Sequence, residues 1–316
     1  MSISIAGPRL VERRTTVVAD DGVPLAVREY RPTDAQVTVV LLHGHCLSAE
    51  SWCAIRDELM QRYTDARIVC YDHRGHGASA EAPARTYNLD QLAGDLHVVL
   101  RAVVPTGPVV LVGHSMGGMT VLTYARKHLD EIGSRIVGVG LIGTAARGLA
   151  DAGLGRLLRN PVLSWLQAAV RHAPTSMEQV KRLGCRVFAP VVGGVEFGDR
   201  HVSRRVVARA IAMHDQTSIA TMTGFLNSFL TYDESRTVPV LSAIPTLVLC
   251  GSADLVTPPP HSAAIATQVE DCDFVCVDGA GHSVILEQPS AVADAITRLV
   301  SRVRDSVEAA HLAHVA

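Results

Sequence analysis

This sequence predicts an α/β fold built on a mostly parallel sheet of about eight strands, with helices on both faces. Short apolar runs typical of buried strands alternate along the chain with stretches in which apolar residues recur every three or four positions, as in amphipathic helices. Such alternation indicates a parallel sheet, whose strands are continuously hydrophobic because helices cover both sides. The 316 residues, 48% of them hydrophobic, can form one large domain, or a core domain with an insertion.

The expected elements follow one another in a regular order. We expect strands at residues 15–19, 24–30, 36–42, 67–71, 109–112, 135–142, 245–249 and 273–277, and helices at 51–63, 88–103, 120–128 and 291–307. Asp20-Asp21-Gly22 is a turn signal, so the first two strands are predicted to form a hairpin at an antiparallel edge of the sheet. Asn88 is expected to open the helix that follows it.

One segment breaks this alternation. Between Thr144 and about Pro239 helical patterns dominate, at residues 154–170, 203–214 and 218–232, and the region 187–192 alone resembles a buried strand. We therefore expect a core domain, residues 1–144 and 240–316, and a helical cap, residues 145–239, over the carboxyl edge of the sheet. From Arg147 to Arg236 the cap holds twelve Lys and Arg against seven Asp and Glu. A solvated helical face explains this surplus more simply than contact with an anionic substrate or a lipid surface.

The charge and the cysteine content narrow the range of expected binding partners and of cellular compartments. The net charge is −2 and no long block of like charge occurs, so nucleic acid is not an expected partner. The seven cysteines are an odd number, and several lie in apolar runs, which favours free thiols and a reducing, cytoplasmic compartment. The longest apolar runs are too short to span a membrane, and peripheral membrane contact stays open.

The stretch around Ser115 carries the strongest chemical signal. The apolar run Val109–Val112 leads into Gly113-His114-Ser115-Met116-Gly117, and a helical pattern follows. This arrangement of strand, sharp turn and helix is typical of a nucleophile elbow, in which glycines leave room for a strained turn that lifts the serine above the sheet. The Met116 amide, at the start of the helix, would face an oxyanion. The alternative is an ordinary turn between a strand and a helix.

A serine hydroxyl needs a base, and the base needs a carboxylate that orients it. Asp254 and His282 each follow one of the last two expected strands, so both should lie at the carboxyl edge of the sheet, where open α/β sheets bind ligands. Asp278 and Asp233 compete with Asp254 for the role of the carboxylate.

Five landmarks occur in chain order. They are His43-Gly44, the loop Asp72-His73-Arg74-Gly75-His76-Gly77-Ala78-Ser79, the turn Gly113–Gly117, Gly251-Ser252-Ala253-Asp254, and Gly281-His282. With them the chain resembles the α/β-hydrolase-fold enzymes of the capped esterase, lipase and peroxidase-like type. The resemblance covers most of the chain and is weakest in the cap.

The resemblance implies a role for each residue. Ser115 would be the nucleophile, His282 the general base and then acid, and Asp254 the carboxylate that fixes the histidine tautomer. The oxyanion hole would consist of the backbone amides of Met116 and His45. The His45 side chain has no assigned role, and His114 is expected to be a packed, hydrogen-bonded residue rather than a second base.

The expected reaction is hydrolysis of a carboxylic ester, either lipid-like, such as a monoacylglycerol, or a small acyl ester. Alternatives on the same fold are a C–C bond hydrolase, a lactonase, a thioesterase and a cofactor-free haloperoxidase that forms peracids. A non-catalytic ligand-binding receptor is an alternative of another class.

The histidine-rich loops contain residue types that bind metal ions. His43 and His45, together with Asp72, His73 and His76, could indicate zinc. The pattern His-x-His-x-Asp-His is absent, however, since Leu47 and Ser48 stand where its last two residues would be, and the Asp72–His76 loop is better explained as a structural network. We therefore expect neither a metal nor a cofactor.

Overall fold

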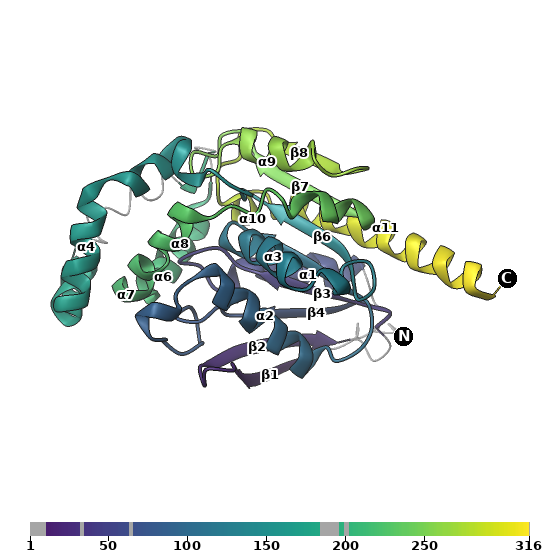
Figure 1. Ribbon diagram of the computed structural model, residues 1–316, viewed down its shortest axis with the longest axis horizontal. Coiled ribbons are helices and arrows are strands. Elements are labelled where there is room, and N and C mark those ends of the chain that lie inside the picture. The colour runs from purple at the N-terminus through teal and green to yellow at the C-terminus, as the bar shows by residue number, and fades with distance from the viewer. Residues whose placement is uncertain (1–10, 32–34, 63–65, 184–195, 199–201, 316) are drawn as a thin grey trace, which may run out of the picture.

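The computed structural model describes residues 11–31, 35–62, 66–183, 196–198 and 202–315. Its centre is one eight-stranded sheet of order β1-β2-β4-β3-β5-β6-β7-β8 (Figure 1). The strands are β1 (Val11–Val18), β2 (Pro24–Arg31), β3 (Val37–Leu42), β4 (Ala66–Tyr71), β5 (Val109–His114), β6 (Ile136–Ile142), β7 (Thr246–Gly251) and β8 (Asp273–Val277). β1 and β2 form an antiparallel hairpin at one edge, β2 is antiparallel to β4, and all other pairs are parallel. The predicted fold class and edge hairpin are confirmed.

Two helical layers cover the sheet. α2 (Leu89–Val103) and α3 (Met116–Lys127) pack on one face, and α1 (Cys53–Arg62) and α11 (Pro289–Val315) on the other. β5 shows why both layers are needed: Val109 and Leu111 belong to the first core cluster, whereas Val110 and Val112 belong to the second. Successive side chains of a strand point to opposite faces, so a run of four apolar residues requires apolar cover on each side.

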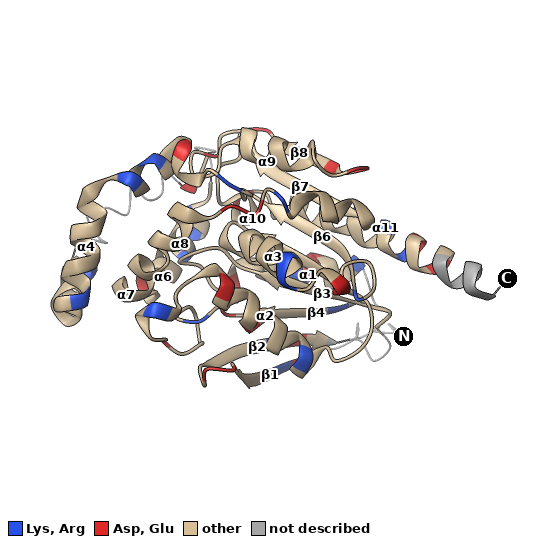
Figure 2. Cartoon of the chain, in the orientation of Figure 1, with Lys and Arg blue, Asp and Glu red and all other residues tan. Residues whose placement is uncertain are grey.

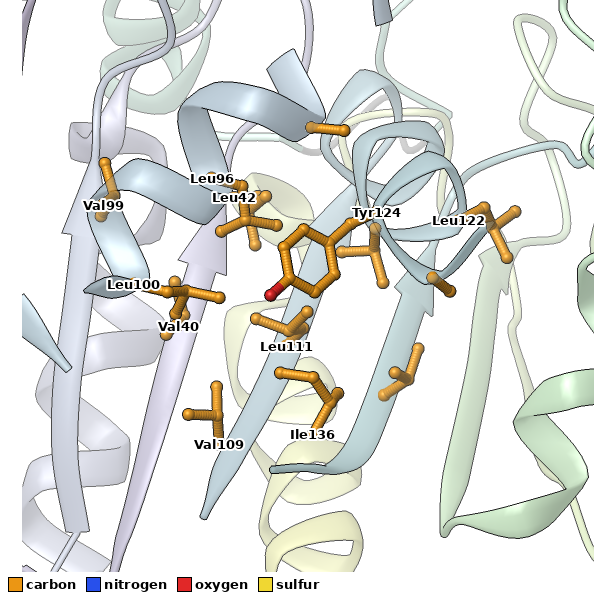
Figure 3. Packing of buried hydrophobic residues seen from close by; sticks show 14 of the residues in the cluster. Val40, Leu42, Leu96, Val99, Leu100, Val109, Leu111, Leu122, Tyr124 and Ile136 are labelled. Atoms are coloured by element: carbon orange, nitrogen blue, oxygen red, sulfur yellow. The ribbon is translucent and has the colours of Figure 1, made fainter. Parts of the chain in front are cut away.

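The first core cluster lies between α2, α3 and the sheet. Figure 3 shows the Tyr124 ring of α3 among Leu111 of β5 and Leu96 and Leu100 of α2. Helix α2 begins as the sequence predicts, because the Asn88 side chain accepts a hydrogen bond from the Gln91 amide at 2.8 Å.

The remaining helical elements of the core are short. The α-helices are α9 (Pro259–Ala266) and α10 (Val284–Glu287), and the 3-10 helices are η1 (Ala49–Trp52), η2 (Ala84–Thr86), η3 (Leu129–Glu131) and η6 (Val238–Ala243).

The described part of the segment between β6 and β7 consists of helices joined by loops, with one isolated bridge between Arg147 and Asp233. It contains η4 (Leu149–Asp151), η5 (Gly153–Arg159), α4 (Pro161–His172), a helix at 174–183, α6 (Arg204–Gln216), α7 (Ile219–Gly224) and α8 (Leu226–Thr231). α4, α6, α7 and α8 gather at one end of the sheet, and α11 runs out beyond the opposite end (Figure 1). Basic residues are spaced along the first part of this segment (Figure 2). The strand-like region 187–192 lies outside the described residues.

Two of the helices expected in this segment are interrupted. The stretch 154–170 divides at Asn160, whose side chain accepts a hydrogen bond from Val162 N at 2.9 Å and so caps a new helix with Pro161 in its first turn. The stretch 218–232 divides at Phe225, which is fully buried.

A third core cluster joins this segment to the sheet domain. Phe225, Phe229 and Tyr232 pack with Met116 and Met119, which form the first turn of α3. Helix α8 and its flanking residues are thus packed against the first turn of α3, directly after Ser115. No helix in the described ranges is both long and apolar enough to cross a membrane.

Candidate active site

Ser115 lies on a strained turn between β5 and α3. Its φ is 52° and its ψ is −118°, a conformation that non-glycine residues rarely adopt. A Cβ on Gly113 would lie 2.3 Å from the backbone of Gly117, and a Cβ on Gly117 would lie 2.3 Å from the carbonyl oxygen of Leu42. Both positions therefore require glycine, for the steric reason that the sequence motif indicates.

The structure brings the three predicted side chains together. The Ser115 hydroxyl oxygen lies 2.9 Å from His282 Nε2, and His282 Nδ1 lies 2.9 Å from Asp254 Oδ2. Asp254 and His282 are both buried, with 2% and 5% of their surface exposed. These distances match a nucleophile, a base and an orienting carboxylate in direct contact.

Asp254 is held by more than the histidine. The amides of Val256 and Thr257 donate to Oδ1 at 2.8 Å each, and the Thr257 hydroxyl donates to Oδ2 at 2.8 Å. Burial alone would raise the pKa of Asp254, but the His282 charge and these hydrogen bonds outweigh it, so the pKa lies below its usual value.

The two competing carboxylates point elsewhere. Asp278 is exposed and accepts from the Ser252 hydroxyl at 3.3 Å. Asp233 is exposed and accepts from the Ser235 amide and hydroxyl.

His282 is surrounded by negative charge. Burial alone would lower its pKa, but Asp254, Glu196 and Glu287 together more than reverse this effect and raise the pKa to about 9. The backbone carbonyl of His282 lies 2.9 Å from His114 Nε2. His114 thus holds the loop that carries His282, consistent with the packed, hydrogen-bonded residue that the sequence predicts.

Met116 and His45, whose amides are expected to form an oxyanion hole, line the same cavity as Ser115. Met116 begins α3, so its N–H has no acceptor within the helix. His45 lies on the loop after β3. The His45 side chain turns away, with Nε2 3.1 Å from the carbonyl of Met222 and its ring against Phe225 and Phe229.

That cavity measures about 210 Å³ and opens onto the Ser115 hydroxyl. Its wall is mostly apolar and comes from both the core and the inserted segment. The apolar lining consists of Leu47, Met116, Met119, Leu149, Leu154, Leu158, Leu226, Phe229 and Val256.

Two polar side chains in the same cavity wall were not predicted. Glu196 and His214, both from the inserted segment, face each other with Oε1 3.8 Å from Nε2. Glu196 accepts from the Ser283 hydroxyl at 2.5 Å, next to His282. Burial alone would raise the pKa of Glu196, but the nearby histidines and Ser283 lower it below the usual value. No motif or periodicity marks this glutamate in the sequence.

The chain around Glu196 is fastened to the loop that carries His282. The Glu287 carboxylate accepts from the amides of both Gly198 and Gly281, at 3.0 and 2.8 Å. The two backbones approach so closely that a Cβ on Gly281 would lie 2.4 Å from Gly198 N. These contacts fix the inserted segment to the loop that carries His282.

The histidine-rich loops form a hydrogen-bonded network below the cavity. His43 Nε2 accepts from the His73 amide at 2.9 Å, and His76 Nε2 accepts from the Cys46 amide at 3.1 Å. Asp72 accepts from the amides of Ala49 and Ala78. The hydrogen bonds of these side chains are therefore made to the backbone of the loops. Burial lowers the pKa of His43 and His76 to about 3, which keeps both imidazoles neutral.

Comparison with known proteins decides the family. Residues 39–295 match the model of the alpha/beta hydrolase family, which is most of the chain. The chain belongs to the alpha/beta hydrolase family. This confirms the expected family and its hydrolase activity.

Relatives of this hydrolase cleave different bonds. It is 28% identical to the mouse sn-1-specific diacylglycerol lipase ABHD11 over 83% of this chain and 80% of the lipase. It is 25% identical to the proline iminopeptidase PfmaB of Pestalotiopsis fici over 86% of this chain and 94% of that protein. Among solved structures it is similar to a thermophilic esterase from Thermogutta terrifontis, with a TM-score of 0.74, 26% identity, and 92% and 99% of the two chains covered.

Proposed function

We propose that this hydrolase cleaves a carboxylic ester through an acyl-enzyme formed on Ser115. The observation that carries the proposal is the chain of contacts from Ser115 Oγ through the His282 ring to Asp254, at 2.9 Å on each side of the ring. The similarity to a lipase and to an esterase supports an ester as the bond that is cleaved.

The reaction takes place in two halves. His282 Nε2 removes the Ser115 proton while Oγ attacks the ester carbonyl carbon, and Asp254 stabilises the imidazolium that forms. The amides of Met116 and His45 donate to the oxyanion of the tetrahedral intermediate. The C–O bond to the alcohol then breaks, and His282 protonates the leaving alkoxide. Water repeats the sequence on the acyl-enzyme, releasing the carboxylic acid and restoring Ser115.

The substrate we propose is a lipid-like or small acyl ester. The cavity is lined mostly by apolar side chains and binds an acyl group by burial of its hydrocarbon. Its volume, about 210 Å³, lies below the roughly 300–1,000 Å³ of sites for drug-sized ligands. This size favours a short acyl group or a single narrow chain. In this proposal residues 145–239 are a cap that decides which acyl group enters.

The test is hydrolysis of p-nitrophenyl esters of increasing acyl length by wild type, Ser115→Ala and His282→Ala. We expect each variant to lose ~10³-fold or more in kcat, because nucleophile and base act as one unit. Ser134→Ala and His172→Ala are matched controls at exposed positions and should keep wild-type rates. Hydrolysis that persists in Ser115→Ala would contradict the proposal that Ser115 is the nucleophile. If the wild type hydrolysed none of the esters, the proposal of ester cleavage would be contradicted. Thioesters, substrates with a cleavable C–C bond, and peroxide would then be the substrates to test.

A further inference from the structure

A group of two histidines and one glutamate lies away from the catalytic residues. His97 is on α2, His128 directly follows α3, and Glu131 is on η3. In both imidazoles Nδ1 lies near the same carboxylate oxygen, Glu131 Oε1, at 3.8 Å from His97 and 4.0 Å from His128. These separations are too long for hydrogen bonds. One ligand atom from each of the three residues lies within 4.8 Å of the others, which is close enough to surround a metal ion.

The glutamate is held in place from behind. The Tyr124 hydroxyl donates to Oε2 at 2.6 Å, and an Arg135 guanidinium nitrogen lies 3.3 Å from the same oxygen. Oε2 is therefore occupied, and Oε1 is presented to the two imidazoles. Metal-binding carboxylates are commonly oriented in this way by a second layer of hydrogen bonds.

The imidazoles are stacked and incompletely bonded. Their ring centroids are 4.3 Å apart, with an angle of 5° between the planes. His97 Nδ1 is buried and makes no hydrogen bond with any described residue. The three side chains are 28%, 22% and 16% exposed, so the group lies near the surface of the molecule.

We propose that His97, His128 and Glu131 bind a divalent transition-metal ion such as Zn²⁺. Two neutral imidazoles and a carboxylate are a common set of protein ligands for zinc, and water would occupy the fourth position. With bonds of about 2.0–2.2 Å, tetrahedral ligand atoms lie roughly 3.4 Å apart. Each imidazole nitrogen therefore needs to move about half an ångström closer to Oε1. The ligand atoms of the two histidines, within 4.8 Å of each other, also need to approach as the rings rotate out of their stack. The ion would fasten α2 to the end of α3.

The experiment titrates the full-length, chelator-treated protein with ZnCl₂ by calorimetry at pH 7.5. We compare wild type with His97→Ala, His128→Ala and Glu131→Gln, and His172→Ala is the control at an exposed histidine. We expect one Zn²⁺ per chain in wild type and control, and binding weakened ~10-fold or more in each of the three variants. Thermal denaturation gives a second readout: Zn²⁺ should raise the Tm of wild type and control but not of the three variants. Equal Zn²⁺ binding and equal Tm shifts in all five proteins would overturn the proposal, as would no binding in wild type.

Discussion

At the scale of single residues, the charge around His282 sets the pH at which the proposed base works. A general base must be neutral to accept the serine proton, and the carboxylates around His282 raise its pKa to about 9. We therefore expect kcat/KM to fall as the pH decreases below about 9. A profile of kcat/KM against pH for a p-nitrophenyl ester measures this fall, which forms the acidic limb of the profile.

Glu196→Gln tests whether the Glu196 charge helps to set the pH of this acidic limb. Removing the Glu196 charge, which helps to raise the pKa of His282, should move the limb to lower pH and so increase the relative rate at neutral pH. Glu270→Gln, at an exposed position away from the cavity, is the control. A limb that stays in place, or moves to higher pH, would show that Glu196 does not act on the base electrostatically.

The sequence predicts the three central residues but not their surroundings. Ser115, Asp254 and His282 each follow a strand of the sheet, so the carboxyl edge brings them together whatever the detail of the loops. Glu196 reaches the cavity from the inserted segment, through long-range contacts with Ser283 and His214. Such contacts leave no spacing or periodicity along the chain, and therefore nothing in the sequence indicated them.

At the scale of elements, the turn between β5 and α3 depends on how closely α3 approaches β3. Gly117→Ala would place a Cβ 2.3 Å from the Leu42 carbonyl oxygen and 2.9 Å from that of His43. We expect a loss of about 1–3 kcal/mol in the free energy of unfolding, because one of the two backbones must shift. Ester hydrolysis should also fall, since the Met116 amide moves with the turn. Urea denaturation and the ester assay measure the two effects.

Gly94→Ala is the matched control for this substitution. Gly94 lies within α2, and the nearest atom to a Cβ there is a Gln91 side-chain nitrogen at 4.0 Å. Alanine is preferred over glycine inside a helix, so this variant should gain roughly 0.5–1 kcal/mol. A loss at both glycines would contradict the steric argument at Gly117.

Strands were easier to predict than helix ends. The five strands from β3 to β7 carry their apolar runs in the sequence because they are covered on both faces, whereas β8 is an edge strand with Phe274 exposed. The breaks at Asn160 and Phe225 were missed, since a periodic pattern continues across them. A local cap makes the first break, and the second coincides with the burial of Phe225 between the inserted segment and the core.

At the scale of the whole molecule, one buried cation connects three separate parts of the chain. The Arg74 side chain, fully buried in the loop after β4, bonds to Asp95 of α2 at 2.6 and 2.7 Å and to Asp21 of the first hairpin turn at 2.8 and 3.1 Å. Arg74→Met would leave the Asp95 carboxylate buried without its cation. We expect a loss of about 3–5 kcal/mol in the free energy of unfolding, measured by urea denaturation.

An exposed ion pair provides the comparison. Arg62→Met removes the contacts of Arg62 with Glu58 and Asp294 at the surface and should cost no more than about 1 kcal/mol. If the two substitutions were equally mild, the Arg74 contacts would not hold the hairpin, the loop and α2 together.

The fastening of Gly198 to Gly281 through Glu287 has a consequence for redesign. Residues 145–239 suggest a replaceable module, since both their ends connect to neighbouring strands of one sheet. This segment nevertheless contacts the loop that carries His282 at Gly198, where a Cβ would lie 2.5 Å from the Gly279 carbonyl oxygen. A chimera that takes this region from another hydrolase must therefore keep a glycine at this point of contact, together with the Glu287 carboxylate. Otherwise a change of substrate range would come with a displaced His282.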